Sequence, residues 1–221
     1  MSSPGGAGEP ETRVVGAGAP GVVEEAARLL AGGALVAFPT DTVYGVGCDP
    51  WSAEAIARLY AAKERPLHMA IPVLVASPED VAQVAEAPAG EADRLLRRFW
   101  PGALTVVLRR RAGVPDLLTA GGGTVAVRMP DHPLALRLIA AAGGALAVTS
   151  ANRSGRPSPE TAAEVLADLA GRIALLIDGG RAPLGVPSSI VDLTTHPPRL
   201  LREGHLSLAT LRETLPDLYR A

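Results

Sequence analysis

Residues 34–63, "ALVAFPTDTVYGVGCDPWSAEAIARLYAAK", contain the pattern that decides the fold class. The apolar run "ALVAF" predicts a short buried strand, and Pro39 ends that strand at a polar turn. The stretch from 52 to 63 predicts an amphipathic helix with Ser52 as its N-cap. A buried strand followed at once by such a helix indicates an α/β architecture.

The same alternation continues along the chain. Further strands are expected at "IPVLVA", "ALTVVLR", "TVAVRMP", "ALAVTS", "IALLIDGG", "SSIVDLT" and "RLLREG", and helices at "VVEEAARLLAGG", "SPEDVAQVAEA", "ADRLLRRFW", "PLALRLIAAAGG", "TAAEVLADLAG" and near 208–215. We therefore predict one α/β domain over residues 13–215, with helices packed on a central sheet. The strands between 173 and 202 follow one another without helices, so the sheet should be mixed. Residues 1–12 are rich in Gly, Pro and Ser, which predicts a disordered tail, and no linker marks a second C-terminal domain.

Composition sets further limits. The chain has 221 residues, 48% of them hydrophobic, which is enough for a full core. Lys and Arg total 21 against 23 Asp and Glu, so any contact with nucleic acid must be a local patch. The single cysteine, Cys48, excludes an internal disulfide, and the four histidines are too far apart for a structural zinc motif. Without a secretory pattern or a membrane span, we expect a cytoplasmic protein.

Two glycine-rich stretches suggest phosphate binding. Gly16, Gly18 and Gly21 match G-x-G-x-x-G, with Asp41 downstream in the place of a ribose-binding acid. The strand required before that motif is only two valines long, so a flexible entry to the first helix is the alternative. The stretch from Gly121 to Thr124 is not followed by Gly-Lys-Ser/Thr, and a mobile turn explains it equally well.

Polar groups gather where predicted strands end. They are Thr40, Asp41, Thr42, Arg128, Thr149, Ser150 and Asn152, and Lys63 and Arg65 end the helix that starts at Ser52. Ligands of open α/β sheets bind at such strand ends, although cations at a helix end also have a purely structural explanation. No histidine stands near Ser150 to complete a hydrolase triad. Cations, hydroxyls and an amide without a nucleophile favour a nucleotidyl transferase.

Six segments, in this order, resemble the YrdC/Sua5 family of threonylcarbamoyl-AMP synthases. They are "FPTDTVYGVGCDP", "AIARLYAAKERP", "FWPGALTVVL", "TVAVRMPDHP", "TSANRSGRPSP" and "SSIVDLT…PRLLREG", and the resemblance runs from about residue 14 to about 212. The chain is similar to the short, single-domain form of the family. The resemblance implies a YrdC-like fold, in which a twisted, mostly mixed sheet surrounds a large concave cavity.

The resemblance also implies a reaction. L-threonine and bicarbonate would form N-carboxythreonine, whose carboxylate attacks the α-phosphate of ATP and yields threonylcarbamoyl-AMP and pyrophosphate. A separate tRNA threonylcarbamoyl transferase complex would then use this product to make N6-threonylcarbamoyladenosine at position 37 of tRNA. Mg²⁺ is expected on the ATP phosphates, with no ligands from protein side chains.

The family's functional positions carry over onto residues of this sequence. Threonine binding would fall to Thr40, Arg128 and Ser150; Lys63 and Arg65 would be catalytic; and ATP would be bound by Lys63, Arg65, Thr124, Ser150, Asn152 and Arg202. The planar guanidinium of Arg128 suits a carboxylate.

The sequence departs from the family's pattern after its Lys-x-Arg-Pro segment. Many relatives have Asn-Pro and then a histidine that helps to bind threonine, where this chain has Met69, Ala70 and Leu74. Leucine cannot donate a hydrogen bond, so the affinity or choice of amino acid is open to change. Our hypothesis is that His68, or backbone near it, takes over part of that role.

Two alternative functions stay open. A related domain in hydrogenase-maturation carbamoyltransferases makes a carbamoyl adenylate, within much longer chains. A non-catalytic RNA-binding module would need a clustered basic face, and the sequence offers only the arginine clusters within 97–99 and 109–111. With 3% aromatic residues for base stacking, at most weak tRNA contact is expected.

Overall fold

The computed structural model describes residues 11–86 and 89–220. Most of the predicted tail, residues 1–12, lies outside the described residues. Thr12 belongs to the folded part, because its hydroxyl donates a hydrogen bond to the carbonyl of Ile173 at 2.7 Å.

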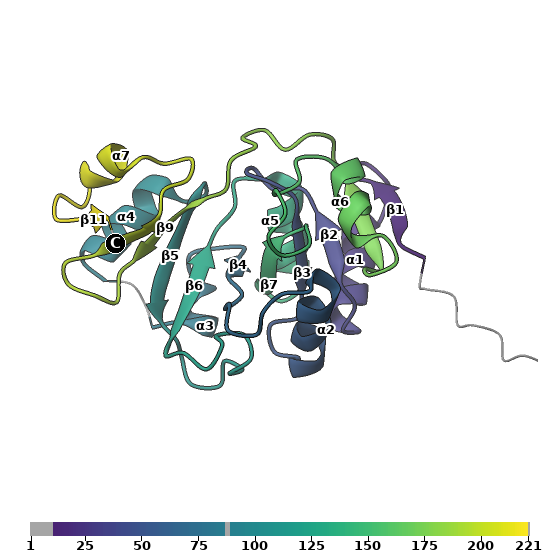
Figure 1. Cartoon of the computed structure of the whole chain (residues 1–221), viewed down its shortest axis with the longest axis horizontal. Coiled ribbons are helices and arrows are strands. Elements are labelled where there is room, and N and C mark those ends of the chain that lie inside the picture. Colours follow the sequence, from purple (N-terminus) through teal and green to yellow (C-terminus); the bar gives the residue numbers. More distant parts are fainter. Residues whose placement is uncertain (1–10, 87–88, 221) are drawn as a thin grey trace, which may run out of the picture.

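The elements alternate much as the sequence predicts (Figure 1). The strands are β1 (Arg13–Gly16), β2 (Val36–Phe38), β3 (Gly45–Cys48), β4 (Val73–Val75), β5 (Leu104–Arg109), β6 (Thr124–Arg128), β7 (Ala145–Ser150), β8 (Leu175–Asp178), β9 (Ser189–Asp192), β10 (Arg199–Arg202) and β11 (Tyr219–Arg220). The helices are α1 (Val22–Ala31), α2 (Ala53–Lys63), α3 (Val81–Val84), α4 (Glu91–Phe99), α5 (Pro133–Ala141), α6 (Ala162–Leu169) and α7 (Leu208–Arg212).

All of these strands join one sheet in the order β1-β8-β2-β3-β7-β4-β6-β5-β9-β10-β11. The prediction of a mixed sheet is confirmed: β4 is parallel to β6 but antiparallel to β7, and β5 is parallel to β9 but antiparallel to β6. In Figure 1, β1 lies at one end of the molecule, and β9, β11 and α7 lie at the other.

Helices cover both faces of the sheet. The buried side chains of α1 and α5 form one core with Phe38, whereas α2, α4 and α6 contribute to a second core with Tyr44. Strand β4 serves both cores, because Val73 and Val75 point into the second core and Leu74 into the first. Burial on both faces explains why the predicted strands are continuous apolar runs instead of alternating patterns.

Strands β1, β3 and β11 were not predicted, and β11 extends the sheet beyond the predicted domain end at residue 215. Of the three, β3 lies within the sheet, between β2 and β7. Two of its four residues are glycines, which pack closely against the neighbouring strand β7. A Cβ atom on Gly45 would lie 2.7 Å from Cγ1 of Val148, and one on Gly47 would lie 3.0 Å from Cγ2 of the same residue. The absence of a side chain at these two glycines therefore leaves room for the side chain of Val148 in the core.

Candidate functional site

The polar turn after β2 is held by its own side chain. The hydroxyl of Thr40 donates to the carbonyl of Val43 at 2.6 Å and accepts hydrogen bonds from the N–H groups of Thr42 (3.2 Å) and Val43 (3.3 Å). Thr40 is 3% exposed. Short hydroxyl side chains stabilise turns in this way, so Thr40 first of all determines the shape of this turn.

Arg128, at the end of β6, reaches this turn. Its Nε donates to the carbonyl of Gly102 at 2.9 Å, its Nη1 donates to the hydroxyl of Thr42 at 2.8 Å, and its Nη2 pairs with the carboxylate of Asp41. Both members of the ion pair are 7% exposed as side chains. The strand ends after β2 and after β6 therefore meet, although β3, β7 and β4 lie between these strands in the sheet.

Lys63, the last residue of α2, is the only lysine in the sequence. It is 1% exposed, and its ammonium group donates to the backbone carbonyls of Ser150 and Asn152. Its pKa is lowered from 10.5 to about 7, mainly by burial and to a smaller extent by the positive charge of Arg65. A pKa so close to neutral, in a group held by fixed carbonyls, is typical of functional sites.

These two groups of residues are neighbours. Gly45 pairs with Ser150 across β3 and β7, and the N–H of Ala151 donates to the carbonyl of Tyr44 at 2.8 Å. The segment that bonds to Lys63 therefore lies against the strand that follows the Thr40 turn.

Arg65 and Arg202 are engaged with backbone carbonyls. Arg65 donates to the carbonyls of Met69 at 3.0 Å and Ala70 at 2.8 Å, which closes the loop after α2. Arg202, on β10, donates to the carbonyl of Ser188 from Nε at 3.0 Å and from Nη2 at 2.9 Å.

Thr124 stands apart from this cluster. It begins β6 and pairs with Arg109 of β5, and within the described part of the chain its side chain has no hydrogen bond to the other predicted site residues. Hydrogen bonds and the pairing of β3 with β7 thus link the surroundings of Thr40, Lys63, Arg128, Ser150 and Asn152, whereas Thr124 is connected to them through its own strand, β6.

A second positive charge affects each of the two buried cations of the site. The charge of Arg65 lowers the pKa of Lys63, and the charge of Arg202 lowers the pKa of Arg128, in both cases after the larger effect of burial. At Arg128, Asp41 acts in the opposite direction, and its effect, which raises the pKa, is larger than that of Arg202. A buried cation whose pKa is lowered by a second cation, as that of Lys63 is by Arg65, favours binding of an anion, which relieves the repulsion.

Three polar residues of this region were not singled out as site residues by the sequence reasoning. The hydroxyls of Thr105 and Ser188 lie 2.8 Å apart beneath Arg202, and Asp168 of α6 is 8% exposed near Lys63. Asp168 had a sequence signal, since it stands three residues after Val165 on the buried face of a predicted helix, where a charged residue needs a partner.

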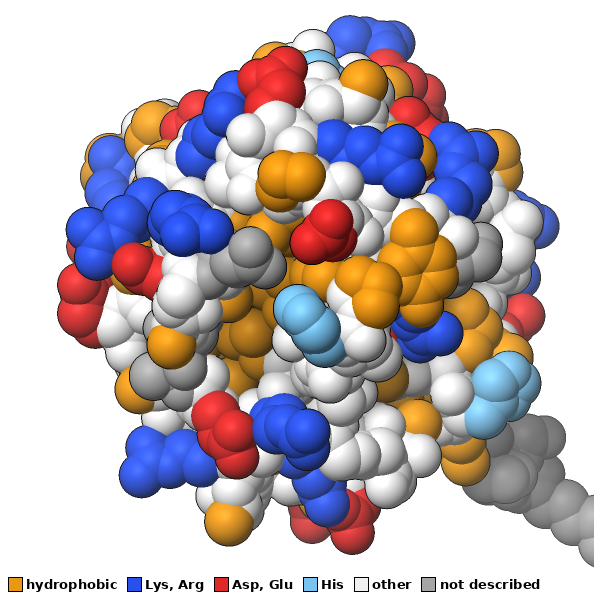
Figure 2. Space-filling model, turned by 90° about the vertical axis from the view of Figure 1, so that its left-hand side faces the viewer, with side chains coloured by type: hydrophobic (Ala, Val, Ile, Leu, Met, Phe, Trp, Pro, Cys, Tyr) orange, Lys and Arg blue, Asp and Glu red, His pale blue; other side chains and the backbone are white. Residues whose placement is uncertain are grey.

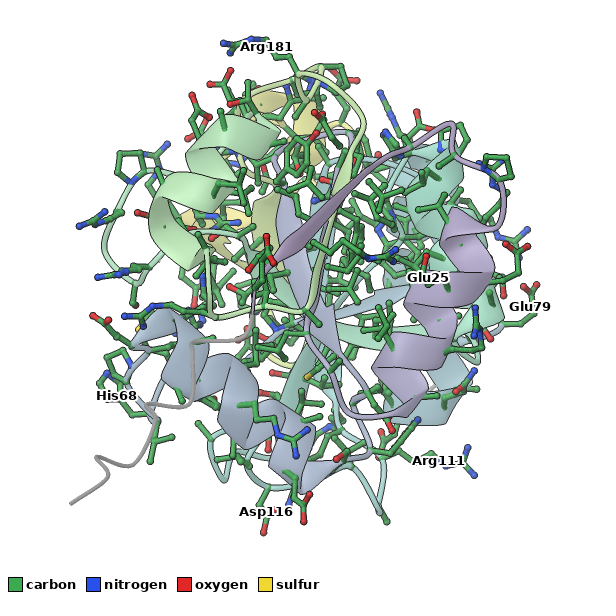
Figure 3. All side chains as sticks on the ribbon, turned by 90° about the vertical axis from the view of Figure 1, so that its right-hand side faces the viewer. Glu25, His68, Glu79, Arg111, Asp116 and Arg181 are labelled. Atoms are coloured by element: carbon green, nitrogen blue, oxygen red, sulfur yellow. The ribbon has the colours of Figure 1, made fainter. Side chains whose placement is uncertain are left out.

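The position that holds a histidine in many relatives is part of the core here. Leu74 is 5% exposed and packs with the side chains of α1 and α5, so it has a structural role. His68 lies on the exposed loop after α2, at the outer edge of the molecule (Figure 3). Its participation in threonine binding stays a hypothesis.

The arginine clusters are used within the chain. Arg97 pairs with Asp93 at 2.9 Å, and Arg98 pairs with Glu213. Arg111 donates to the carbonyl of Ala82 at 2.6 Å. On the face that carries α4 and α7, acidic and apolar side chains interrupt the basic ones (Figure 2). This face is not the continuous basic surface that an RNA-binding module requires.

The glycine motif near the N-terminus belongs to an edge of the sheet. Strand β1 is largely exposed and pairs only with β8 in the described part of the chain, so it is not the buried first strand of a dinucleotide-binding unit. Gly21 serves as the N-cap of α1 with φ 71°, a conformation that favours glycine.

Comparison with known proteins identifies the family. The Sua5/YciO/YrdC family, described as "Telomere recombination", matches residues 28–204. The chain belongs to this family. It is 44% identical over 193 residues to a threonylcarbamoyl-AMP synthase of Pyrococcus abyssi, covering 87% of this chain and 57% of the relative. It is 45% identical over 204 residues to a threonylcarbamoyl-AMP synthase of Bacillus subtilis, covering 89% and 57%.

A solved Sua5 structure also matches. The crystal structure of P. abyssi Sua5 complexed with L-threonine aligns with a TM-score of 0.88 at 42% identity, covering 90% of this chain and 58% of that one. The α/β fold expected for a Sua5/YciO/YrdC protein is thus confirmed, while its large concave cavity stays a prediction. The chain spans little more than half the length of these relatives, 57% in both curated cases. Among the described residues, no helix is both long enough and apolar enough to cross a membrane.

Proposed function

We propose that this chain is a nucleotidyltransferase that makes threonylcarbamoyl-AMP from L-threonine, bicarbonate and ATP. The names of its relatives and the L-threonine complex of P. abyssi Sua5 support the substrates. In the proposed reaction, the amine of threonine bonds to the carbon of bicarbonate with loss of water and gives N-carboxythreonine. A carboxylate oxygen of this intermediate then attacks the α-phosphorus of ATP, and the bond to the β-phosphate breaks to release pyrophosphate.

One observation supports this chemistry more than the others: two buried cations, Lys63 and Arg128, reach neighbouring segments, the chain that follows β7 and the turn that contains Thr40. Burial lowers the pKa of both cations; the charge of Arg65 adds to this effect at Lys63, while at Arg128 the opposing effect of Asp41 is larger than that of Arg202. A carboxylate and a triphosphate are the anions that this reaction brings to the site. Their binding relieves the repulsion between Lys63 and Arg65, and the fixed cations then stabilise the negative charge that moves onto pyrophosphate.

We assign the residues by their chemistry and burial. Arg128, which Asp41 and Thr42 hold in place, binds the threonine carboxylate. Lys63 and Arg65 bind the triphosphate and the carboxylate that derives from bicarbonate. Thr40 shapes the threonine pocket, since its hydroxyl already bonds within its own turn. The remaining contacts to threonine and ATP are assigned to Thr124, Ser150, Asn152 and Arg202.

Mg²⁺ enters this scheme as part of the substrate. It would arrive on the phosphates of ATP and leave with pyrophosphate, which neutralises charge on the leaving group. Within the described ranges, no group of three or more His, Cys, Asp and Glu side chains is arranged to hold a metal ion.

The product has a defined use. Threonylcarbamoyl-AMP is a mixed anhydride, so the next step must be transfer of its acyl group to a nucleophile. We propose that a tRNA threonylcarbamoyl transferase complex carries out this transfer in the cytoplasm, at N6 of adenosine 37 of tRNA. This chain would then need no more than weak contact with tRNA.

Pyrophosphate release tests the proposal. We would measure it with MgATP and bicarbonate, comparing L-threonine, L-serine and no amino acid, for the wild type and for Lys63→Met. We expect release that requires threonine and falls by about 10²-fold or more in Lys63→Met, the size of effect seen when a charge-stabilising donor is removed. Arg97→Met, which changes an exposed cation of α4, serves as the control and should keep full activity. ATP binding without release for any amino acid would instead favour the carbamoyl-adenylate or RNA-binding alternatives.

A further inference from the structure

Of the two carbonyl groups that hold Lys63, that of Ser150 ends strand β7, whereas that of Asn152 belongs to a segment without regular secondary structure. Strand β7 ends at Ser150, and residues 151–161 form turns before α6 begins. The N–H of Ser154 donates to the carbonyl of Lys63 itself at 2.8 Å, so the segment and the end of α2 are bonded in both directions. A loop that must hold an ammonium group in place needs support from outside itself.

Part of that support is internal. The Nδ2 group of Asn152 donates to the carbonyls of Arg153 at 2.9 Å and Arg156 at 2.7 Å. These bonds curl the segment into a compact turn, but they connect it to no other element.

Asp168 supplies the connection to α6. Its Oδ2 accepts the N–H of Arg153 at 3.0 Å, its Oδ1 pairs with the guanidinium of Arg156, and its backbone carbonyl accepts Nε of Arg153 at 3.1 Å. One carboxylate thus binds both ends of the turn that Asn152 curls. The Asp168 side chain is 10% exposed, whereas that of Arg156 is 56% exposed.

The charges around Lys63 give Asp168 a second effect. Arg65 lies two residues after Lys63, and the carboxylate of Glu64 forms ion pairs with Arg153 at 3.5 Å and with Arg172 at 2.9 Å. Asp168 is the acid whose charge raises the pKa of Lys63, against burial and Arg65.

We propose that Asp168 is a positioning residue, which holds the turn after β7, and with it the carbonyl of Asn152, in place for Lys63. The negative charge of Asp168 also favours the ammonium form of Lys63. Its consequence for catalysis rests on the proposed function, in which Lys63 binds anions as an ammonium ion. Asp168 itself touches no substrate in this assignment. A merely structural Asp168 would affect stability without changing the titration of Lys63.

The single lysine makes the proposal directly measurable. Protein labelled with ¹³Cε-lysine gives one side-chain signal, whose pH titration reports the pKa of Lys63 without any substrate. We expect Asp168→Asn to lower this pKa by about 0.5 to 1 unit, as loss of a nearby opposite charge does. Asp168→Glu, which keeps the charge, should restore much of the difference.

Two further variants make the result decisive. Asp192→Asn is the control variant, because Asp192 is 6% exposed at the end of β9. Its carboxylate accepts the N–H of Thr194 at 2.9 Å, and its loss should leave the Lys63 titration unchanged.

Arg156→Met changes an exposed side chain and leaves Asp168 with one cation fewer, so it should raise the pKa of Lys63. The opposite signs of Asp168→Asn and Arg156→Met support the proposal, and should Asp168→Asn fail to fold, Arg156→Met alone decides. Titrations of Asp168→Asn and Arg156→Met that match the wild type would overturn it.

An activity profile separates this proposal from the proposed function. In Asp168→Asn, the pH at which kcat/KM of pyrophosphate release begins to fall should shift downward together with the Lys63 pKa. An inactive wild type would contradict the proposed function, while the NMR titration would still decide the role of Asp168.

Discussion

The carboxylate of Asp41 and the guanidinium of Arg128 form an ion pair in which both side chains are 7% exposed, although 87 residues separate them in the chain. The pair joins the turn after β2 to the end of β6. Oδ2 of Asp41 is buried and has no hydrogen-bond partner within the described part of the chain. Burial of this pair therefore costs free energy of desolvation, and removal of either partner would leave the other charge buried and uncompensated.

Asp41→Asn should destabilise the protein by about 3 to 5 kcal/mol, because it leaves the charge of Arg128 buried and uncompensated. Urea unfolding followed by circular dichroism measures the change. Asp93→Asn is the matched control, since Asp93 pairs with the exposed Arg97 and should cost no more than about 0.5 kcal/mol. Equal losses in the two variants would contradict a structural role for the buried pair.

Gly45→Ala should cost about 1 to 3 kcal/mol, because the added Cβ would lie 2.7 Å from Cγ1 of Val148 and overpack β3 against β7. Thermal and urea unfolding report the loss. In the double variant with Val148→Ala, the loss of stability should be smaller than the sum of the losses in the two single variants, since the smaller side chain leaves room for the added Cβ. Gly16→Ala is the control, because its Cβ would meet no atom within 4 Å. Additive losses in the double variant would show that this contact is not the cause.

Tyr44→Phe should cost about 1 to 3 kcal/mol through lost hydrogen bonds at a buried site. The hydroxyl accepts the N–H of Gly179 at 3.0 Å and donates to the carbonyl of Gly180 at 2.7 Å, so it ties β3 to the end of β8. In the variant, the rate of amide hydrogen exchange should increase most at Gly179, whose N–H loses its acceptor. Tyr219→Phe, at a residue that is 39% exposed, should change stability by less than about 0.5 kcal/mol. Unchanged exchange at Gly179 would argue against the bond.

Lys63 should make stability depend on pH in a definite direction. Its pKa falls from 10.5 in the unfolded chain to about 7 in the folded chain, so the unfolded state binds more protons between these values. The free energy of unfolding of the wild type should therefore rise with pH across this window, relative to Lys63→Met, by up to about 1.4 kcal/mol per pH unit. Urea unfolding at several pH values measures the difference. Parallel pH dependences in the two proteins would mean that Lys63 keeps an ordinary pKa.

Local signals in the sequence predicted local structure well. Ser52 caps α2 as expected, with its hydroxyl accepting the N–H of Ala55 at 3.1 Å. The apolar runs become strands, and the positions where the strands end carry most of the candidate site residues. Capping and turn chemistry act over three or four residues, so a single sequence contains all the information they need.

Features that depend on the order of strands were not predictable from the residues. The contact between Asp41 and Arg128 follows from a sheet in which β7 and β4 lie between β3 and β6. Strand β3 was missed because two glycines weaken the strand pattern, and the reason for them is Val148, about one hundred residues away. The contacts of Asp168 likewise could not be predicted, because they depend on the packing of α6 beside the segment that bonds to Lys63.

The most direct test of the central claim uses ¹³C-labelled bicarbonate. The protein would be incubated with MgATP, L-threonine and the labelled bicarbonate, and the nucleotide products would be identified by mass spectrometry. We predict an adenylate that contains threonine and carries the ¹³C label, formed together with pyrophosphate. An adenylate without the label, or ATP that is cleaved only to ADP and phosphate, would contradict the proposed synthesis of threonylcarbamoyl-AMP.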